Sequence, residues 1–301
     1  MRFGLLGTGP WARRTHGPAL AAHEGVELVG VWGRRPEAAL ELASELGTRP
    51  YDDVDALFAD CDAVAVALPP DVQAPLAVRA AEAGCHLLLD KPVATTVEGA
   101  RGVTAAVDRT GVASVVFFTL HFSEPSASWL RARRAEEGWL LGRADWLSPV
   151  FGGGDSPYAA SPWRRERGAL WDIGPHALSV LLPLLGDVRS LDDVHAAGGH
   201  GDTVHLTLRH TSGASSTATL SHSVPPEASG VTAEVRGTAG VAALPERDEG
   251  PAEAFARAID ALISAASGTG VEAAAEAGPP CDVRLAQRVT EILARAEAAL
   301  R

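Results

Sequence analysis

The sequence predicts an α/β protein of two domains: a doubly wound parallel sheet over residues 1–118, then an α+β domain over residues 119–301. Apolar runs alternate with helix-like segments through the first region, which is typical of a parallel sheet covered on both faces. Short segments of alternating polarity follow and indicate an antiparallel or mixed sheet. A chain of 301 residues with 46% hydrophobic residues is long enough for two cores.

In the first domain, apolar runs predict strands at residues 3–6, 26–32, 63–68, 86–89 and 112–118. Segments rich in Ala, Leu and Glu predict helices at residues 35–46 and 75–83, and Gly47 and Gly84 stand where glycine commonly ends a helix. Pro18 is expected to kink or shorten the helix after the first strand. Right-handed crossovers between these strands would build a nucleotide-binding sheet.

In the second domain, Ser123 is placed to cap a helix that runs to Glu137. The other expected features are a glycine-rich loop at 152–154, strands at 203–209 and 216–222, and helices at 252–266 and 283–300 joined by a Gly/Ala/Pro-rich link at 267–280. Val204, Leu206 and Leu208 share one strand face, so this sheet should have one covered and one open face. We expect the open face to form a floor for substrate.

Composition excludes several classes of partner and site. The net charge of −12 argues against a nucleic-acid partner, which normally requires a basic surface. Cys61, Cys85 and Cys281 lack metal-ligand spacing and are odd in number, so they predict buried thiols without a disulfide framework or a zinc site. His205 and His210 fall on opposite faces of a strand, where they cannot share one ion, and no metal is expected.

No run reaches the length of roughly 18 to 20 apolar residues that a membrane-spanning helix needs. The first residues begin a strand at once, without a charged leader. The sequence therefore predicts no membrane partner and a cytoplasmic location.

A glycine turn follows the first strand and reads Gly7-Thr8-Gly9-Pro10-Trp11-Ala12. Gly7 permits the tight turn, Gly9 lets the backbone approach a pyrophosphate, and Ala12 keeps the helix close to the strand. The pattern predicts a dinucleotide site. The alternative is a strand-to-helix turn with a structural role only.

The end of the second strand reads Trp32-Gly33-Arg34-Arg35, without the acidic residue that accepts the ribose 2′-hydroxyl of NAD. Two guanidinium groups suit a 2′-phosphate, because arginine binds phosphate through charge-assisted hydrogen bonds. NADP is therefore the preferred cofactor. If Arg34 only stacks on the adenine, NAD remains open.

Two further segments suggest chemistry. Asp90-Lys91-Pro92 ends an apolar strand, which would hold Lys91 near whatever the glycine turn binds. Asp172 and His176 are four residues apart at the start of an apolar helix, so they should share one helix face as a proton-transfer pair. The alternative for this pair is a capping carboxylate followed by an ordinary buried histidine.

With these motifs in order, the chain resembles the glucose-fructose oxidoreductase, inositol dehydrogenase and MocA (Gfo/Idh/MocA) family of nicotinamide-dependent oxidoreductases. The resemblance is carried by Gly7-Thr8-Gly9, Leu68-Pro69-Pro70, Asp90-Lys91-Pro92 and Asp172-x-Gly174-x-His176. It implies a dinucleotide domain followed by a substrate domain. The second domain should hold a large, mostly antiparallel sheet that forms dimer or tetramer contacts.

The resemblance also implies roles for individual residues. Lys91, Asp172 and His176 would be catalytic, with His176 exchanging the proton and Lys91 donating to the reacting oxygen. The cofactor would lie against Gly7, Thr8, Gly9, Pro10, Trp11, Gly33, Arg34, Arg35, Leu68, Pro69, Pro70, Gln73, Asp90 and Lys91. The substrate would contact Lys91, His121, Trp163, Arg164, Asp172 and His176. Arg164 could equally be an exposed loop arginine.

The chain departs from the family pattern at several positions: Asp90 replaces a usual Glu, Gln73 a His, His121 a frequent Arg, and Ser179 a common acid. The substrate can therefore differ from an ordinary cyclic polyol. The expected function is hydride transfer between a nicotinamide and a sugar, cyclitol or related hydroxy or oxo compound. Two alternatives stay open: a non-catalytic nucleotide sensor or regulatory subunit, and redox-assisted glycoside cleavage.

Overall fold

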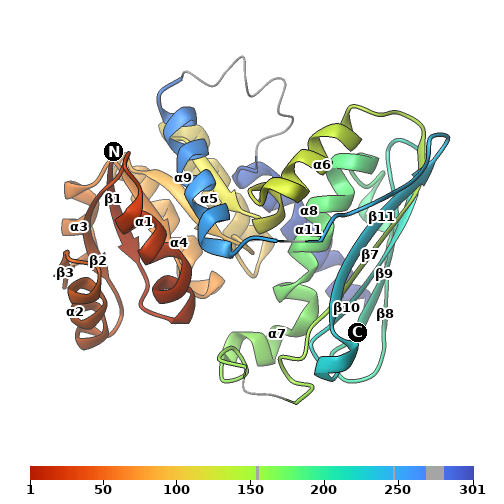
Figure 1. The fold of residues 1–301 in the computed structure, drawn as a ribbon, viewed down its shortest axis with the longest axis horizontal. Coiled ribbons are helices and arrows are strands. Elements are labelled where there is room, and N and C mark those ends of the chain that lie inside the picture. The colour runs from red at the N-terminus through yellow and green to blue at the C-terminus, as the bar shows by residue number, and fades with distance from the viewer. Residues whose placement is uncertain (154–155, 247, 269–280) are drawn as a thin grey trace. The chain divides into compact units, whose positions relative to one another are not determined.

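A computed structural model describes residues 1–153, 156–246, 248–268 and 281–301 of this chain. Contacts divide the chain into two compact units (Figure 1). The first unit contains residues 1–123 and 248–287, and the second contains residues 124–247 and 288–301. This grouping differs from the predicted boundary after residue 118, because residues 119–123 and 248–287 belong to the first unit.

The first unit is built on six parallel strands in the order β3-β2-β1-β4-β5-β6. Their bounds are β1 (Arg2–Leu6), β2 (Glu27–Trp32), β3 (Arg49–Tyr51), β4 (Ala63–Val66), β5 (His86–Asp90) and β6 (Ser114–Phe117). The predicted doubly wound sheet is confirmed. The short strand β3 was not predicted, because three residues that include a proline show no apolar run.

Helices of the first unit are α1 (Gly17–Ala22), α2 (Pro36–Glu45), α3 (Val54–Asp60), α4 (Pro70–Glu82), α5 (Val97–Thr110) and α9 (Pro251–Ala266). Gly47 and Gly84 have φ of +67° and +88°, so both predicted helix stops adopt the left-handed backbone that glycine tolerates. Pro18 lies in the first turn of α1, directly after a π-helical turn, η1 (Ala12–His16). The first helical segment is thus composite.

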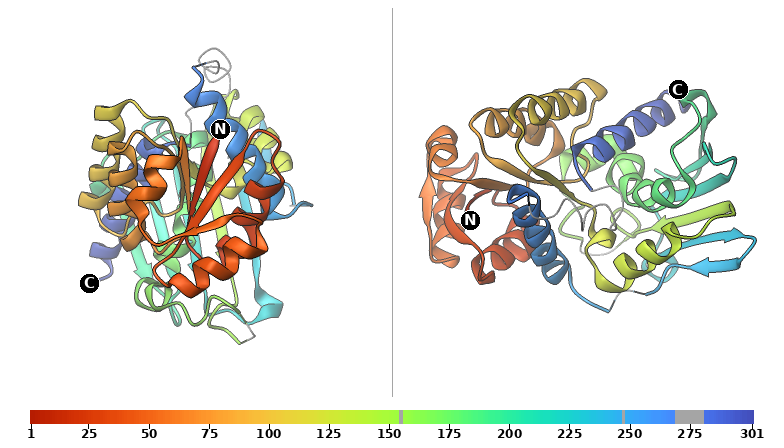
Figure 2. Two further views of the ribbon diagram at one scale, coloured as in Figure 1. Left: turned by 90° about the vertical axis from the view of Figure 1, so that its left-hand side faces the viewer. Right: turned by 90° about the horizontal axis from the view of Figure 1, so that it is seen from above.

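The helix α9 explains why a late part of the chain belongs to the first unit. Phe255, Ala258, Ile259 and Leu262 on this helix are fully buried, and they join the core formed with β1, β5 and β6. Figure 2 shows α9, drawn in blue, alongside the first-unit strands. An amphipathic helix buries its apolar face against whichever surface it meets, and sequence order does not determine that choice.

The second unit holds a six-stranded sheet in the order β12-β11-β7-β10-β9-β8. Its strands are β7 (Trp139–Leu147), β8 (Val194–Gly198), β9 (Val204–Arg209), β10 (Ser215–Ser221), β11 (Gly230–Gly237) and β12 (Gly240–Ala243). Only the described pair β7–β10 is parallel, so the mostly antiparallel sheet is confirmed. The helices are α6 (Glu124–Arg134), α7 (Pro162–Asp172), α8 (Gly174–Leu185) and α11 (Val283–Ala299), of which α11 begins in the first unit.

One face of the second sheet is covered by helix α8, which packs on β7, β10 and β11. Along β9, Val204, Leu206 and Leu208 are buried and alternate with exposed residues, which confirms one covered and one open face. His205 is exposed and His210 buried, so these two histidines do point to opposite faces.

By length and composition, the stretch Pro162–Leu185 is long and apolar enough to cross a membrane, contrary to the prediction that no run in the chain reaches that length. It comprises α7 and α8, and 83% of its most apolar 18-residue segment is buried within the protein. Its side chains form much of the second unit's core, as Leu178, Val180 and Leu181 show. The stretch is therefore explained as the core helices of a folded unit.

Cys61, Cys85 and Cys281 are buried thiols, as predicted. Residue 154 of the predicted glycine-rich loop and residues 269–280 of the predicted link lie outside the described residues.

Candidate functional site

The predicted nucleotide-contacting residues follow the carboxyl ends of neighbouring strands in the first unit. Gly7 follows β1, Gly33 follows β2, Leu68 lies just beyond β4, and Lys91 follows β5. The strand order β2-β1-β4-β5 brings these four strand ends to one edge of the sheet. In open α/β sheets this edge is where ligands bind.

The glycine turn has the geometry that close approach of a phosphate requires. Gly7 has a φ of +125°, and its amide donates to the Trp32 carbonyl at 2.8 Å. A Cβ on Gly7 would lie 2.3 Å from the Ala67 carbonyl oxygen, so a side chain there would collide with backbone. A Cβ on Gly9 would meet nothing within 4 Å, which leaves open space beside the helix start.

The end of β2 packs against this turn and carries two exposed arginines. A Cβ on Gly33 would lie 2.6 Å from Thr8 Cγ2, so the two segments are in close contact. Arg34 and Arg35 are exposed, and neither guanidinium group makes a hydrogen bond or ion pair with any of the residues that the structure describes. Arg13, in contrast, pairs with Glu41 and Glu45 at 2.5 Å each.

The backbone around Lys91 is held by the buried side chain of Gln73. Gln73 Nε2 donates to the Asp90 carbonyl at 2.7 Å, and Gln73 Oε1 accepts from the Asp90 amide at 2.9 Å. The same nitrogen lies 3.2 Å from the Pro92 carbonyl oxygen. Asp90 Oδ1 accepts from the Lys91 amide at 2.8 Å. Gln73, predicted to contact the cofactor, thus uses its amide to fix the turn that carries Lys91.

The side chain of Trp11, a predicted cofactor contact, is partly buried. It packs against the core cluster of the first unit, and its ring meets His16 edge-on with centroids 6.3 Å apart.

His121, a predicted substrate contact, lies in a 3-10 turn, η2 (Thr119–His121), with its ring 6.3 Å from that of Phe118.

In the second unit, Asp172 and His176 do not lie on one continuous helix. Asp172 ends α7 and His176 lies in the first turn of α8, with Ile173 between the helices at φ −109° and ψ −17°. The predicted shared helix face is therefore wrong. The physical reason is Pro175, which has no amide hydrogen to continue the first helix but suits the first turn of a new one.

Asp172 is nearly buried and binds two nitrogen donors through one oxygen. Its Oδ2 lies 2.7 Å from Arg164 Nε and 3.1 Å from His222 Nε2. The Arg164 guanidinium lies over the rings of Tyr158 and Trp163, at 4.7 Å from each centroid. The Arg164 side chain is therefore held in place beside Asp172, and its positive charge compensates the charge of the carboxylate.

Sequence reasoning missed two aromatic residues of this cluster. Trp146 on β7 stacks on His176 with centroids 5.4 Å apart and planes 7° from parallel. His222, directly after β10, contacts Asp172 from a position 50 residues away. In the sequence, His222 ended the predicted strand 216–222 and Trp146 lay where no element was predicted, and neither belonged to a motif that would set it apart.

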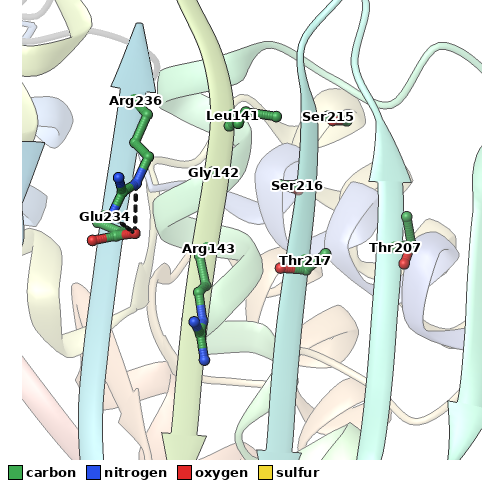
Figure 3. A pocket seen from close by; sticks show the side chains of 9 residues that line it. All are labelled: Leu141, Gly142, Arg143, Thr207, Ser215, Ser216, Thr217, Glu234 and Arg236. Carbon is green, nitrogen blue, oxygen red and sulfur yellow. Dashed lines mark hydrogen bonds and ion pairs between the residues drawn. The ribbon is translucent and has the colours of Figure 1, made fainter. Parts of the chain in front are cut away.

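These residues lie on the helix-covered side of the second sheet, because Trp146 and His222 both reach residues of α7 or α8. The open face carries a separate shallow hollow of about 300 Å³ lined by Leu141, Arg143, Thr207, Thr217, Glu234 and Arg236 (Figure 3). The expectation that the open face forms the substrate floor is thus at odds with where Asp172 and His176 lie.

Comparisons with known proteins match both parts of the chain. A family model described as oxidoreductase family, NAD-binding Rossmann fold, matches residues 1–118. A second, described as GFO/IDH/MocA C-terminal domain, matches residues 129–243.

Among curated relatives, dTDP-3,4-didehydro-2,6-dideoxy-alpha-D-glucose 3-reductase from Streptomyces antibioticus is 33% identical over 66% of this chain. Inositol 2-dehydrogenase from Rhizobium meliloti is 27% identical over 71% of this chain. The matches span 59% and 66% of those two proteins, so the chain covers less than two thirds of either.

A solved structure, the WlbA dehydrogenase from Bordetella pertussis in complex with NADH and UDP-GlcNAcA, superposes with a TM-score of 0.82 at 22% identity. That match covers 99% of this chain and 96% of the other. At this identity the likeness establishes the fold.

Proposed function

Because the chain belongs to the Gfo/Idh/MocA family of oxidoreductases, we propose that it transfers a hydride between a nicotinamide cofactor and a hydroxyl- or carbonyl-bearing carbon. The substrate class that we propose is a sugar, cyclitol or related small molecule, since the relatives carry names of a deoxyhexose reductase and an inositol dehydrogenase. The observation that carries the proposal is Lys91, whose backbone Gln73 holds at the carboxyl end of β5 within a NAD-binding Rossmann unit.

The residues at this strand edge fit a dinucleotide. Gly7, Thr8 and Gly9 would hold the pyrophosphate, because Gly9 leaves open space and the following helix start presents backbone amides. Leu68, Pro69 and Pro70 would line the neighbouring strand end, and α4 begins at Pro70. When bound, the nicotinamide supplies the hydride acceptor or donor.

For alcohol oxidation we assign the proton to His176 and the developing alkoxide charge to Lys91. The ammonium of Lys91 donates a hydrogen bond to the reacting oxygen, while the imidazole of His176 accepts the hydroxyl proton. The carbon loses its hydride and becomes a carbonyl. In the reverse direction His176 returns the proton. Trp146, stacked on His176, restricts the rotation of the imidazole ring.

We propose NADP as the preferred cofactor, on the support of Arg34 and Arg35. Both guanidinium groups are exposed, and neither forms an ion pair with a carboxylate of the described residues. Arg34→Ser combined with Arg35→Ser should weaken NADPH binding roughly tenfold or more, with NADH little changed. Titration by nucleotide fluorescence measures both, and Arg109→Ser on α5 is the matched control. Tighter binding of NADH than of NADPH by the unaltered protein would refute this preference.

We further propose a homo-oligomer assembled through the open face of the second sheet, and a cytoplasmic location. Exposed apolar side chains on that face, including Leu141 and Val241, support the first proposal. Cys61 and Cys85 are buried thiols outside any disulfide, which accords with a reducing compartment and supports the second proposal.

The central experiment screens sugars, cyclitols and their oxo forms with both nucleotides while the absorbance of the reduced ring is followed. The expected result is turnover of at least one compound. His176→Ala should lower kcat by roughly 10²- to 10⁴-fold with nucleotide affinity retained, because a positioned acid/base contributes that much. Nucleotide binding without turnover across the panel would instead favour a sensor or a redox-neutral cleavage reaction. Full activity of the variant would remove His176 from the chemistry.

A further inference from the structure

His222 lies at the end of the parallel strand pair of the second unit, and hydrogen bonds hold both its backbone and its imidazole ring. In the register of β7 and β10, Leu147 pairs with Ser221, and Ser148 and His222 are the next residues along the two strands. The His222 amide donates to Asp202 Oδ1 at 2.9 Å, and its carbonyl accepts from the Phe151 amide at 2.8 Å. The imidazole is buried, with 1% of the side chain exposed.

The two ring nitrogens of His222 join a hydrogen-bonded chain that ends at the guanidinium of Arg164. Ser148 Oγ lies 3.1 Å from Nδ1, Nε2 lies 3.1 Å from Asp172 Oδ2, and that oxygen also accepts from Arg164 Nε at 2.7 Å. An ionised carboxylate can only accept, so Nε2 must carry the hydrogen. In the neutral imidazole, which carries only one ring hydrogen, Nδ1 is then the acceptor for the Ser148 hydroxyl.

A second carboxylate ties the same strand end to α7. Asp202 Oδ1 accepts from the His222 amide, and Asp202 Oδ2 accepts from the Ala169 amide at 2.9 Å. Ala169 follows Gly168, where α7 departs from helical geometry four residues before Asp172, the last residue of the helix. Asp202 thus fixes the backbone on both sides of the His222–Asp172 contact.

We propose that His222 is a positioning residue: its Nε2–H fixes the orientation of the Asp172 carboxylate and, through Asp172, that of the Arg164 guanidinium. As a step in catalysis this inference rests on the function proposed above, whereas the contact itself can be tested without turnover. Two donors on one carboxylate oxygen restrict rotation of the carboxylate, and rotational restriction is what precise placement of a reacting group requires.

Two variants distinguish the hydrogen bond that His222 donates from the space that its side chain fills. His222→Leu removes both ring hydrogen bonds, whereas His222→Gln keeps an amide N–H that can reach Asp172. We expect kcat/KM to fall roughly 10- to 100-fold in His222→Leu, which is the range for a lost hydrogen bond to a charged group. In His222→Gln, the logarithm of kcat/KM should fall by no more than half as much. Nucleotide affinity should stay unchanged. His205→Leu, an exposed histidine on β9, is the matched control.

A second measurement reads the contact directly. In ¹⁵N-labelled protein at pH 8, imidazole spectra should show His222 as the neutral Nε2–H tautomer, with the signal identified by its loss in His222→Gln. The Arg164 Nε–H signal should shift in His222→Leu. An Nδ1–H tautomer, or equal activity losses in the Leu and Gln variants, would overturn the inference. If the unaltered protein turns over no compound, the proposed function fails, and the spectra alone decide for or against the His222 contact.

Discussion

At the scale of single residues, His16 is a titratable group buried without a polar partner. Its side chain is fully buried, stacked on Phe255 with centroids 3.9 Å apart, and edge-on to Phe117. Neither ring nitrogen has a hydrogen-bond partner among the described residues. Burial disfavours the charged form and lowers the pKa of His16 to about 3.

This burial predicts an acid-sensitive contribution to stability. The folded pKa of His16 is lower than the unfolded value of 6.5, so the unfolded chain binds more protons at mildly acidic pH. The contribution of His16 to the free energy of unfolding is complete above pH 6.5, and it is lost as the pH falls towards the folded pKa. By pH 5 the loss should reach about 2 kcal/mol, from 1.4 kcal/mol for each pH unit.

Urea unfolding of the unaltered protein and of His16→Leu at pH 7 and pH 5 measures this contribution. Other titrating groups are common to both proteins, so the comparison isolates His16. The free energy of unfolding should fall less between the two pH values in the variant. Parallel losses in the two proteins would contradict the prediction.

Gln73 and Lys91 show how far single residues can be understood from sequence. The sequence placed Lys91 at a strand end, where the structure has it, because an apolar run and a proline mark that position. It could not show that Gln73 holds the same turn, because those hydrogen bonds join residues 17 apart through a helix-to-strand packing contact. The catalytic and binding roles of the predicted residues stay predictions.

At the scale of elements, the segment from α7 to α8 depends on one glycine. Gly168 lies inside α7 with φ of 63° and ψ of −165°, a conformation that only glycine adopts readily. This departure places Ala169 where its amide reaches Asp202. The predicted single helix through Asp172 and His176 overlooked both this bend and the break at Ile173.

Gly168→Ala should therefore lower the free energy of unfolding by roughly 1 kcal/mol or more, because a Cβ strains this backbone. Gly102→Ala in the middle of α5 is the matched control. A Cβ on Gly102 finds its nearest neighbour, Val78 Cγ2, at 4.0 Å, so alanine there should stabilise the helix by roughly 0.5 to 1 kcal/mol. Thermal or chemical unfolding tests both, and effects of the same sign would be inconsistent with this account.

At the scale of the whole molecule, the open face of the second sheet carries exposed apolar side chains among the residues that the structure describes. Strand register places Val241, Arg236, Leu141 and Ser215 in one row across four strands. Leu141 and Val241 are 52% and 57% exposed. Apolar groups in such a row favour burial against another protein surface, which supports assembly through this face.

Light scattering after size exclusion tests that assembly. The unaltered chain should elute at a multiple of 31.2 kDa. Leu141→Asp combined with Val241→Asp should shift it towards the monomer, because charged groups resist burial in an apolar interface. Leu40→Asp, at an equally exposed leucine on α2, should leave the mass unchanged. A monomeric unaltered protein would rule out this mode of assembly.

The sequence by itself determined the strands β1, β2, β4, β5 and β6, the helices α2 and α4, the glycine turn, and the positions of Lys91, Asp172 and His176 along the chain. Apolar periodicity, glycine stops and proline are local signals, so they survive without knowledge of the fold. Only the tertiary structure decided that α9 belongs with the first sheet, that Gln73 holds the Lys91 turn, and that His222 binds Asp172. Those contacts join distant residues, and strand register and helix packing create them.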